Sequence, residues 1–349
     1  MNMLYYYTNV ETMKHILQDA NIFATNLIYM NDAEEYFNGL KELRDIINTK
    51  SKQELLNQER LEWKLNQEVT SYSISFSTAK DLLSQWSMYA GESGVSLAME
   101  FSGKERYRGY SEDGKRERVS DLSILPRKVH YCTKTAMTSV DYKQVKGDIW
   151  KAIEENNKSV TLSDIKANAE YIWTEMTPYV KRYEFSAEEE YRLVFDWAQL
   201  RERLQIDYRN DANVLKPYLD IECEGGWPIQ EITVGPGFNQ DVVFNSILHF
   251  LNHSKIEVPE LDEVEYIARC KKYFYNSKAL LGKGKEVWKT MKCELRTKGV
   301  KGRYEAYQEI KRKITKALNE DGLDSYRLSN SELSKGGIIL MKSGIPYIF

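Results

Sequence analysis

Short segments that alternate polar and apolar side chains recur along this chain, and irregular helical stretches separate them. The clearest is 71–77, which reads SYSISFS, and strict alternation of this kind is typical of a β-strand with two unlike faces. No regular strand–helix–strand repeat runs through the sequence. Because a parallel doubly wound sheet requires that repeat, the pattern instead predicts an α+β fold.

Other elements follow from the same kind of pattern. Helices are predicted after Asn9, a residue type that caps helices, and at 31–36, 39–69, 81–91, 142–156, 164–180 and 240–253. The charged stretch 103–121 is predicted to be a loop. Further strands are predicted at 3–8, 22–28, 94–101, 129–132, 190–195, 229–234 and 337–348.

The order of these elements suggests three parts. We expect a core domain over 1–255 that carries a helical arm at about 39–69, because the arm's second half is strongly polar. A basic, mainly helical insertion is expected over 256–330, and a final core strand within 331–349. The length of 349 residues is enough for one large core with such insertions.

Composition argues against several classes of protein. The chain lacks the run of about eighteen apolar residues that a membrane span needs. Its first residues, MNMLYYYTNVETMKHIL, lack the basic region and cleavage site of a secretion signal. The four cysteines are scattered without CxxC spacing, which is typical of reduced thiols in the cytosol. We therefore expect a cytoplasmic protein that does not associate with membranes.

Two common nucleotide-binding motifs are also missing. No G-x-G-x-x-G follows the first predicted strand, and LLGKGKE does not fit the P-loop pattern. A nucleotide would therefore have to be held by other means. His249 and His253 are four residues apart on a predicted helix, which is a spacing that can bind a metal, but no third ligand with a supporting motif accompanies them. No metal is expected.

The net charge of −3 hides a strongly basic segment. Between Lys271 and Lys316 there are fifteen Lys or Arg residues against four Glu, with aromatic residues among them. Cations contact phosphates while flat rings stack on bases, so this mixture suits single-stranded nucleic acid. The alternatives are a solvated helical face, or a surface that docks a partner protein or the acidic remainder of the chain. The residues expected to contact nucleic acid are Lys271, Lys272, Lys283, Lys285, Arg303, Lys311 and Arg312.

An acidic run, Glu188-Glu189-Glu190, leads directly into the predicted strand 190–195. In alternating geometry Glu188 and Glu190 share a face that Glu189 does not. Two carboxylates at that spacing repel each other unless a ligand or a cation compensates. The alternative is a solvated loop whose acids pair with nearby cations, namely Lys181, Arg182 and Arg192.

Hydroxyl and aromatic side chains provide a second candidate site. Ser75 and Ser77 end a predicted strand shortly before Trp86 and Tyr89 on a short predicted helix. Hydroxyls at a strand end with rings nearby can line a pocket for a flat heterocycle, although an ordinary amphipathic strand would have the same pattern. Three consecutive tyrosines, 5–7, precede Thr8 in the first strand, which is more than core packing requires.

Taken in order, these pieces resemble a bacterial family of unknown function that is found in phage-resistance settings and is placed within the ADP-ribosyltransferase superfamily. The resemblance spans both ends of the chain but leaves out most of 256–330. The strings that carry it are Leu4-Tyr5-Tyr6-Tyr7-Thr8, Asn31-Asp32-x-x-Glu35, Ser75-Phe76-Ser77 with Ser84-Gln85-Trp86-x-x-Tyr89-Ala90, Gly94-Val95 with Phe101, Glu188-x-Glu190-Tyr191-Arg192, Val234-Gly235-Pro236, and Ser343-x-Ile345-Pro346-Tyr347.

The resemblance implies a core of two packed small β-sheets with surrounding helices, extended here by the basic insertion. It also implies that Glu190 is the catalytic carboxylate and that Glu188 orients the acceptor. The superfamily's triad has a His or Arg in the first strand, a Ser or Tyr in a middle strand and this Glu. The family usually begins Leu-Tyr-His-Tyr-Thr, so Tyr6 stands where the histidine is expected. The chain also ends Ile-Pro-Tyr-Ile-Phe, where the family often has an arginine after the tyrosine.

NAD is the substrate that this resemblance implies, and its binding residues follow from the matching positions. Tyr6 can still form a hydrogen bond with a ribose hydroxyl, and backbone amides together with Tyr6 or Thr8 would hold the nicotinamide end. Ser75 and Ser77 occupy the middle strand, and Trp86 or Tyr89 would supply a stacking wall.

The expected function is therefore transfer of ADP-ribose from NAD to a macromolecule, with RNA or single-stranded DNA as the acceptor. Such an enzyme would act as a toxin in phage defence or growth control, and an acidic antitoxin would be a fitting partner. An NAD glycohydrolase, in which water is the acceptor, is one alternative. A non-catalytic nucleic-acid or protein-binding module on the same fold is the other.

Overall fold

The computed structural model describes residues 3–30, 69–91, 94–119, 124–132, 176–200, 203–211, 213–259, 268–269, 305, 308, 312, 331–334 and 337–345. The chain divides into two compact units, each assembled from separate stretches of sequence. Unit 1 comprises Met1–Ala20, Lys80–Phe101 and Gly225–Phe349, and unit 2 comprises Asn21–Ala79 and Ser102–Glu224.

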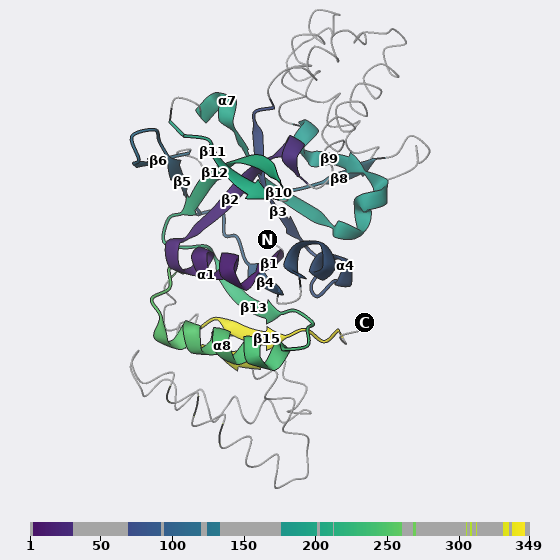
Figure 1. Cartoon of the computed structure of the whole chain (residues 1–349), viewed down its shortest axis with the longest axis vertical. Coiled ribbons are helices and arrows are strands. Elements are labelled where there is room, and N and C mark those ends of the chain that lie inside the picture. The colour runs from purple at the N-terminus through teal and green to yellow at the C-terminus, as the bar shows by residue number, and fades with distance from the viewer. Residues whose placement is uncertain are drawn as a thin grey trace, which may run out of the picture. The chain divides into compact units, whose positions relative to one another are not determined.

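Unit 1 contains a mixed sheet that brings the two ends of the sequence together (Figure 1). Its strands lie in the order β1, β4, β13, β15, β14, and only the β13–β15 pair is parallel. Their bounds are Leu4–Asn9 for β1, Gly94–Met99 for β4, Ile229–Val234 for β13, Ser331–Leu333 for β14 and Ile339–Lys342 for β15.

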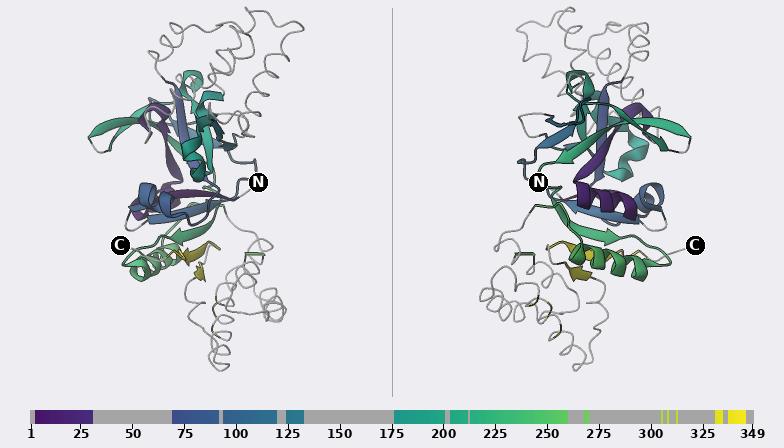
Figure 2. Two further views of the ribbon diagram at one scale, coloured as in Figure 1. Left: turned by 90° about the vertical axis from the view of Figure 1, so that its right-hand side faces the viewer. Right: turned by 60° about the vertical axis from the view of Figure 1, so that its left-hand side comes forward.

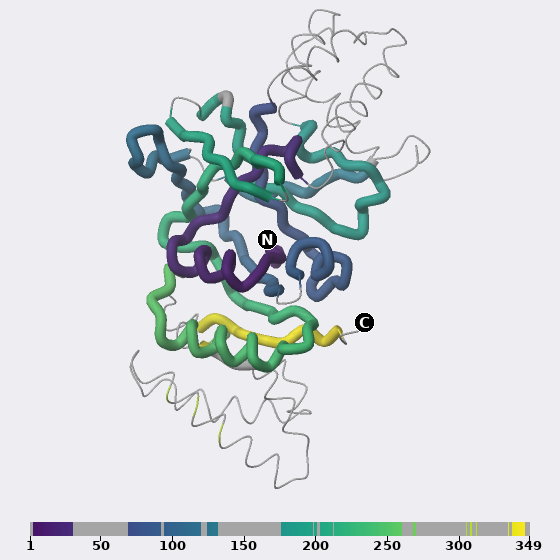
Figure 3. Tube along the Cα trace, viewed as in Figure 1, coloured from purple at the N-terminus to yellow at the C-terminus, as the bar shows by residue number. Residues whose placement is uncertain are grey.

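Helices pack on this sheet through apolar residues at helical spacing. Helix α1, Val10–Asp19, begins at its cap Asn9, whose side chain accepts a hydrogen bond from the backbone N–H of Thr12 at 2.8 Å. Helix α8, Gln240–His253, runs beside β15 (Figure 3). A short helix α4, Leu83–Gln85, continues into a π-helical turn η2, Trp86–Ala90. The helix residues buried are Met13, Ile16 and Leu17 of α1 and Phe244, Ile247 and Leu251 of α8.

Unit 2 is built on an antiparallel sheet with the strand order β3, β2, β12, β5, β6. Strand β10 pairs with β3, β7 pairs with β10, and β11 pairs with β12. The β11–β12 hairpin reaches beyond the other strands of this sheet (Figure 2). The bounds are β2 Asn21–Asn26, β3 Ser71–Ser77, β5 Tyr107–Tyr110, β6 Arg116–Arg118, β7 Arg127–Lys128, β10 Glu190–Asp196, β11 Asp207–Asp211 and β12 Val214–Cys223.

Smaller elements complete unit 2. Strands β8, His130–Cys132, and β9, Val180–Arg182, form a separate parallel pair. The short helices are η1 Leu27–Tyr29, η4 Thr177–Tyr179, η5 Tyr183–Glu188 and α7 Trp197–Leu200.

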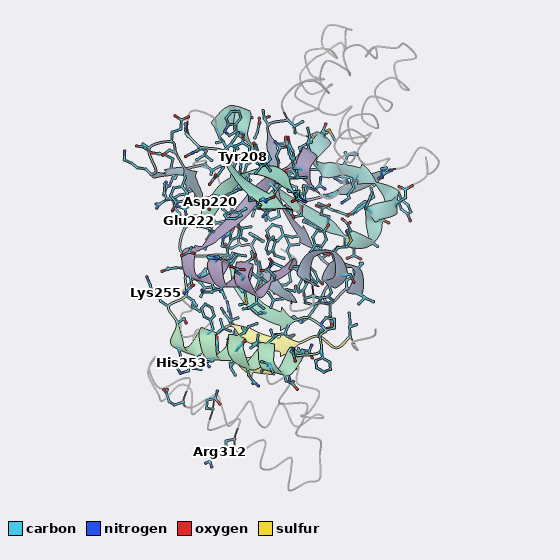
Figure 4. The ribbon with its side chains drawn as sticks, viewed as in Figure 1. Tyr208, Asp220, Glu222, His253, Lys255 and Arg312 are labelled. Atoms are coloured by element: carbon cyan, nitrogen blue, oxygen red, sulfur yellow. The ribbon has the colours of Figure 1, made fainter. Side chains whose placement is uncertain are left out.

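The sheet of unit 2 has one apolar and one polar face. Residues directly opposite each other in antiparallel strands share a face, so the registers assign each side chain. Tyr72, Ile74 and Phe76 of β3 share the apolar face with Leu193 and Phe195 of β10, and all five are buried. The serines of β3 share the polar face with Glu190, Arg192 and Asp196 of β10. The polar face continues across β12 through Asp220 and Glu222 (Figure 4).

The predicted α+β class is confirmed, and several elements match their predicted bounds. Strand β13 and helix α8 span the predicted residues, as does β3. The predicted helix 81–91 begins only at Leu83 and becomes π-helical at Trp86. At the end of the predicted helix 164–180 the described residues form the turn η4 and the start of β9.

The prediction of a loop at 103–121 is wrong, because this stretch contains the β5–β6 hairpin. Three of its charges, Arg108, Arg116 and Arg118, lie on the polar face of the sheet. Arg108 Nε donates to Glu224 Oε1 at 2.6 Å, and Arg116 Nε lies 3.1 Å from Glu222 Oε2. The predicted elements at 31–36, 39–68 and 142–175, and most of 256–330, lie outside the described residues.

Candidate functional site

The strongest candidate site lies on the polar face of unit 2, where β10 begins beside the end of β3. Glu190, the first residue of β10, is directly opposite Ser77, and Arg192 is opposite Ser75. The two strands are more than a hundred residues apart in sequence, yet their pairing brings the predicted acid and the predicted hydroxyls together.

The backbone that carries the acids is held by several hydrogen bonds. Glu188 ends the turn η5, and Glu189 follows in the left-handed region with φ 45° before Glu190 starts β10. Ser77 Oγ donates to the carbonyl of Glu188 at 2.6 Å, and the N–H of Glu190 donates to the Tyr131 hydroxyl at 2.8 Å. Glu188 is therefore not in strand geometry, as the sequence pattern assumed, but the turn at Glu189 still directs it to the side of Glu190.

Two buried cations hold the carboxylates. Arg192 donates through Nε to Glu190 Oε1 at 2.7 Å and through Nη2 to Oε2 at 3.0 Å, and its Nη1 donates to the carbonyl of Pro178 at 2.8 Å. Lys181 Nζ lies 2.7 Å from Glu188 Oε2 and 3.2 Å from Glu190 Oε2. The four charged residues are between 2% and 9% exposed. The alternative of a solvated loop is thus half right, because the pairing occurs but in a buried cluster.

This environment determines the protonation of Glu190. Burial by itself raises the pKa of its carboxyl, but the charges of Arg192 and Lys181 and the hydrogen bonds to the carboxylate outweigh burial and lower the pKa from 4.5 to about 2. Glu190 is therefore an anion throughout the neutral range. The Tyr131 hydroxyl beside it has a raised pKa, first because of burial, and stays protonated.

The two predicted hydroxyls have different roles. Ser77 is engaged with the chain itself, since its Oγ donates to Glu188 and accepts from the N–H of Ala79 at 3.0 Å. Ser75 lies close enough to Glu190 to help lower its pKa. Within the described part of the chain, however, the buried Ser75 Oγ forms no hydrogen bond of ordinary geometry. Of the two hydroxyls, Ser75 is therefore the one less committed to hydrogen bonds within the chain.

The other predicted NAD-binding residues belong to unit 1. Tyr6 and Thr8 point to one face of β1, and Tyr5 and Tyr7 point to the other, as alternation requires. Thr8 is 6% exposed. On the Tyr7 face, Trp86 packs edge-on against Tyr7 with ring centroids 4.8 Å apart.

Trp86 is a core residue of unit 1. Its side chain is 3% exposed, and a Cβ on Gly235 would come within 2.7 Å of its ring. Tyr89, on the same turn, is 38% exposed and is the more accessible of the two predicted stacking rings. Sequence reasoning missed the partner of Trp86, Asp81, whose Oδ1 accepts from the indole N–H at 2.9 Å.

The predicted nucleic-acid contacts fall mostly outside the described residues. Lys271, Lys272, Lys283, Lys285, Arg303 and Lys311 are among those not described, whereas Arg312 is described and exposed (Figure 4). The histidine pair on α8 is described: the rings of His249 and His253 are stacked with centroids 4.2 Å apart, and His253 Nδ1 lies 2.9 Å from the carbonyl of His249.

The described residues contain no group of three or more His, Cys, Asp or Glu side chains that could hold a metal ion. Within the same residues, no helix is long and apolar enough to cross a membrane.

Sequence reasoning missed how Lys181 and Tyr131 take part in the site. The sequence pattern suggests Lys181 only as a partner of acids in a solvated loop, and it gives no signal for Tyr131. They are neighbours in the parallel β8–β9 pair, and this pairing between distant segments is what points both at the acids.

No family model, no curated protein and no solved structure matches this chain.

Proposed function

We propose that this protein is an ADP-ribosyltransferase that uses NAD as a substrate and Glu190 as its catalytic carboxylate. The observation that carries the proposal is the placement of an ionised Glu190 at the start of β10, in register with the hydroxyl end of β3. The family resemblance places the serine and the acid in these two strands, and the register brings the strands side by side. The finer description of the fold, a core of two packed small sheets, belongs to the same proposal.

The chemistry suits a fixed carboxylate. Breaking the bond between nicotinamide and ribose builds positive charge on the sugar, and an anion beside it stabilises that charge more in the transition state than in the ground state. Glu190 would hold a ribose hydroxyl as well. A carboxylate has about four lone-pair positions, and Arg192 and Lys181 occupy three of those on Glu190.

The Ser75 hydroxyl beside Glu190 fits a sugar that both donates and accepts hydrogen bonds. Glu188 would orient the acceptor, as the resemblance implies. Tyr6, Thr8 and Tyr89 are proposed as contacts for the nicotinamide end from the sequence resemblance alone, and Tyr89 is the preferred stacking ring because of its exposure.

One observation favours a second candidate, a non-catalytic binding module on the same fold. Both carboxylates are buried and are already paired with cations of this chain. A cluster of this kind can have a purely structural role, in which it joins β3, β10 and the segment 177–188. The two candidate functions make different predictions: only the enzyme consumes NAD, and its consumption of NAD depends on Glu190.

The acceptor and the biological setting are proposed from the sequence. The basic segment would bind RNA or single-stranded DNA as the acceptor, and the activity would act as a toxin in phage defence, restrained by an antitoxin. If water is the acceptor, the same residues would make an NAD glycohydrolase.

Product analysis tests these alternatives. The wild-type protein and the Glu190→Gln variant would be incubated with NAD labelled in its adenylate part, with and without cellular RNA, DNA and protein. We expect label on a macromolecule, lost by about 10²-fold or more in the variant. Label only in free ADP-ribose would indicate the glycohydrolase. Unchanged NAD with the wild-type protein in every mixture would contradict the proposal and favour the binding module.

A further inference from the structure

Lys181 touches both acids of the candidate site. Its ammonium nitrogen lies 2.7 Å from Glu188 Oε2 and 3.2 Å from Glu190 Oε2, and the side chain is 5% exposed. Arg192, by contrast, donates two hydrogen bonds to Glu190 and one to the carbonyl of Pro178. Lys181 therefore sets the position of the two acids relative to each other.

The position of Lys181 follows from the β8–β9 pair. Tyr131 of β8 and Lys181 of β9 are register partners, and each reaches Glu190. The Tyr131 hydroxyl accepts from the backbone N–H of Glu190, and Lys181 binds its carboxylate. Lys181 Nζ also lies 4.7 Å from the centre of the Phe185 ring, within the range of a cation–π contact. The ammonium group is thus enclosed by two carboxylates and a ring.

We propose that Lys181 is a positioning residue that holds Glu188 and Glu190 side by side as a charged pair, ready for a substrate that becomes cationic as it reacts. The proposal rests on the proposed function. Without the ammonium group, Glu188 would lose this cation while Arg192 still binds Glu190, and repulsion between the two buried carboxylates would favour uptake of a proton by one of them. The charged and titratable groups that face the pair from the described elements are Lys181 of β9, Tyr131 of β8 and Arg192 of β10.

The experiment compares pH profiles of nicotinamide release from NAD. In Lys181→Met we expect the acidic limb of kcat/KM to move upward by about one pH unit or more, because repulsion within the pair raises a carboxyl pKa. Lys181→Arg, which keeps the charge, should retain the wild-type limb. Lys128→Met, a change of an exposed lysine on β7, is the matched control.

A double variant separates positioning from simple support of the fold. Adding Glu188→Gln to Lys181→Met removes the second carboxylate, so the acidic limb should return toward the wild-type position. If Lys181→Met alone does not fold, the pH profile of the double variant is compared with that of the wild-type protein instead. A limb that stays unmoved in Lys181→Met, or a shift that persists in the double variant, would overturn the proposal.

Failure of the proposed function would be recognised separately. If the wild-type protein releases no nicotinamide, the transferase proposal fails, and the pair is then followed by NMR of ¹³C-labelled glutamate side chains. One of the two carboxyl groups should titrate at a higher pH in Lys181→Met than in the wild-type protein. Identical titration in the two proteins would overturn the role of Lys181.

Discussion

At the scale of residues, the main feature is a pair of carboxylates that would repel each other without nearby cations. Two carboxylates, Glu188 and Glu190, come together away from solvent, and Lys181 and Arg192 neutralise them. A buried ion pair does not by itself stabilise a fold, since desolvation offsets attraction. Removing one member is costly, however, because its partner is left charged and unpaired.

Glu190→Gln should therefore lower the free energy of unfolding by about 3–5 kcal/mol, the usual effect of breaking a buried ion pair. Glu189→Gln makes the same chemical change at the exposed neighbouring residue and should stay within about 0.5 kcal/mol of the wild-type protein. Urea unfolding followed by circular dichroism measures both. Equal stability of the two variants would contradict the structure of this cluster.

The acid dependence of stability offers a second check on Glu190. Its folded-state pKa is lowered from 4.5 to about 2, so its stabilising contribution is fully present above about pH 4.5 and is lost as the pH falls toward 2. Each pKa unit corresponds to about 1.4 kcal/mol, which makes the contribution roughly 3 kcal/mol.

The difference in unfolding free energy between the wild-type protein and Glu190→Gln should accordingly shrink between pH 5 and pH 2. Unfolding curves at several pH values would measure it. A difference that is constant over this range would mean that the folded-state pKa of Glu190 is not depressed.

At the scale of elements, the sequence pattern predicted the strands and helices that are determined by interactions between residues close in sequence. Alternation predicted β3 within its observed bounds, and helical spacing with Asn9 as cap predicted α1. The β5–β6 hairpin was missed because its outward side chains are charged and its strands are short. The left-handed turn at Glu189 was also missed, since a non-glycine residue with positive φ leaves no sequence signal.

Asp81 shows how one such residue joins distant segments of unit 1. It has φ 62°, accepts the indole N–H of Trp86, and accepts from Ser343 Oγ and from the N–H of Gly344 at 2.9 Å. Asp81→Ala should therefore loosen the segment 343–345, with amide exchange at Gly344 at least about tenfold faster, because the two hydrogen bonds from this segment are lost.

Asp81→Asn is the matched variant, because asparagine tolerates the left-handed backbone and keeps one acceptor oxygen. Its exchange rate at Gly344 should fall between those of the wild-type protein and Asp81→Ala. Hydrogen–deuterium exchange would measure the series. Equal exchange in all three proteins would show that Asp81 does not hold this segment.

At the scale of the whole molecule, the α+β class could be predicted but the pairing of distant segments could not. Strand β15 is parallel to β13 although about a hundred residues separate them, and β10 is paired with β3 across a similar distance. Nothing in either local pattern specifies the partner. The candidate acid and serine could thus be chosen from sequence and resemblance, whereas the cations that control them required the assembled sheet.

The basic segment leads to a prediction for the whole chain. If it binds nucleic acid, affinity for a single-stranded RNA oligonucleotide should fall steeply with salt, with a slope of log K against log salt of about −0.7 for each phosphate neutralised. Replacing Lys271, Lys272, Lys283 and Lys285 by glutamine should make this slope less steep, because fewer phosphates are neutralised. Fluorescence anisotropy measures both, and binding that is independent of salt would contradict the assignment.

The proposal that Glu190 is the catalytic carboxylate of an NAD-using enzyme is tested most directly by the rate of nicotinamide release from NAD. The proteins to compare are the wild type, Glu190→Asp and Glu189→Gln. Glu190→Asp keeps the charge but withdraws the carboxylate by one methylene, so a positioned catalytic group should lose activity although the cluster keeps its charge balance. We expect release by the wild-type protein and by Glu189→Gln, and a rate lower by about 10²-fold or more in Glu190→Asp. Equal release by all three proteins would contradict the proposal.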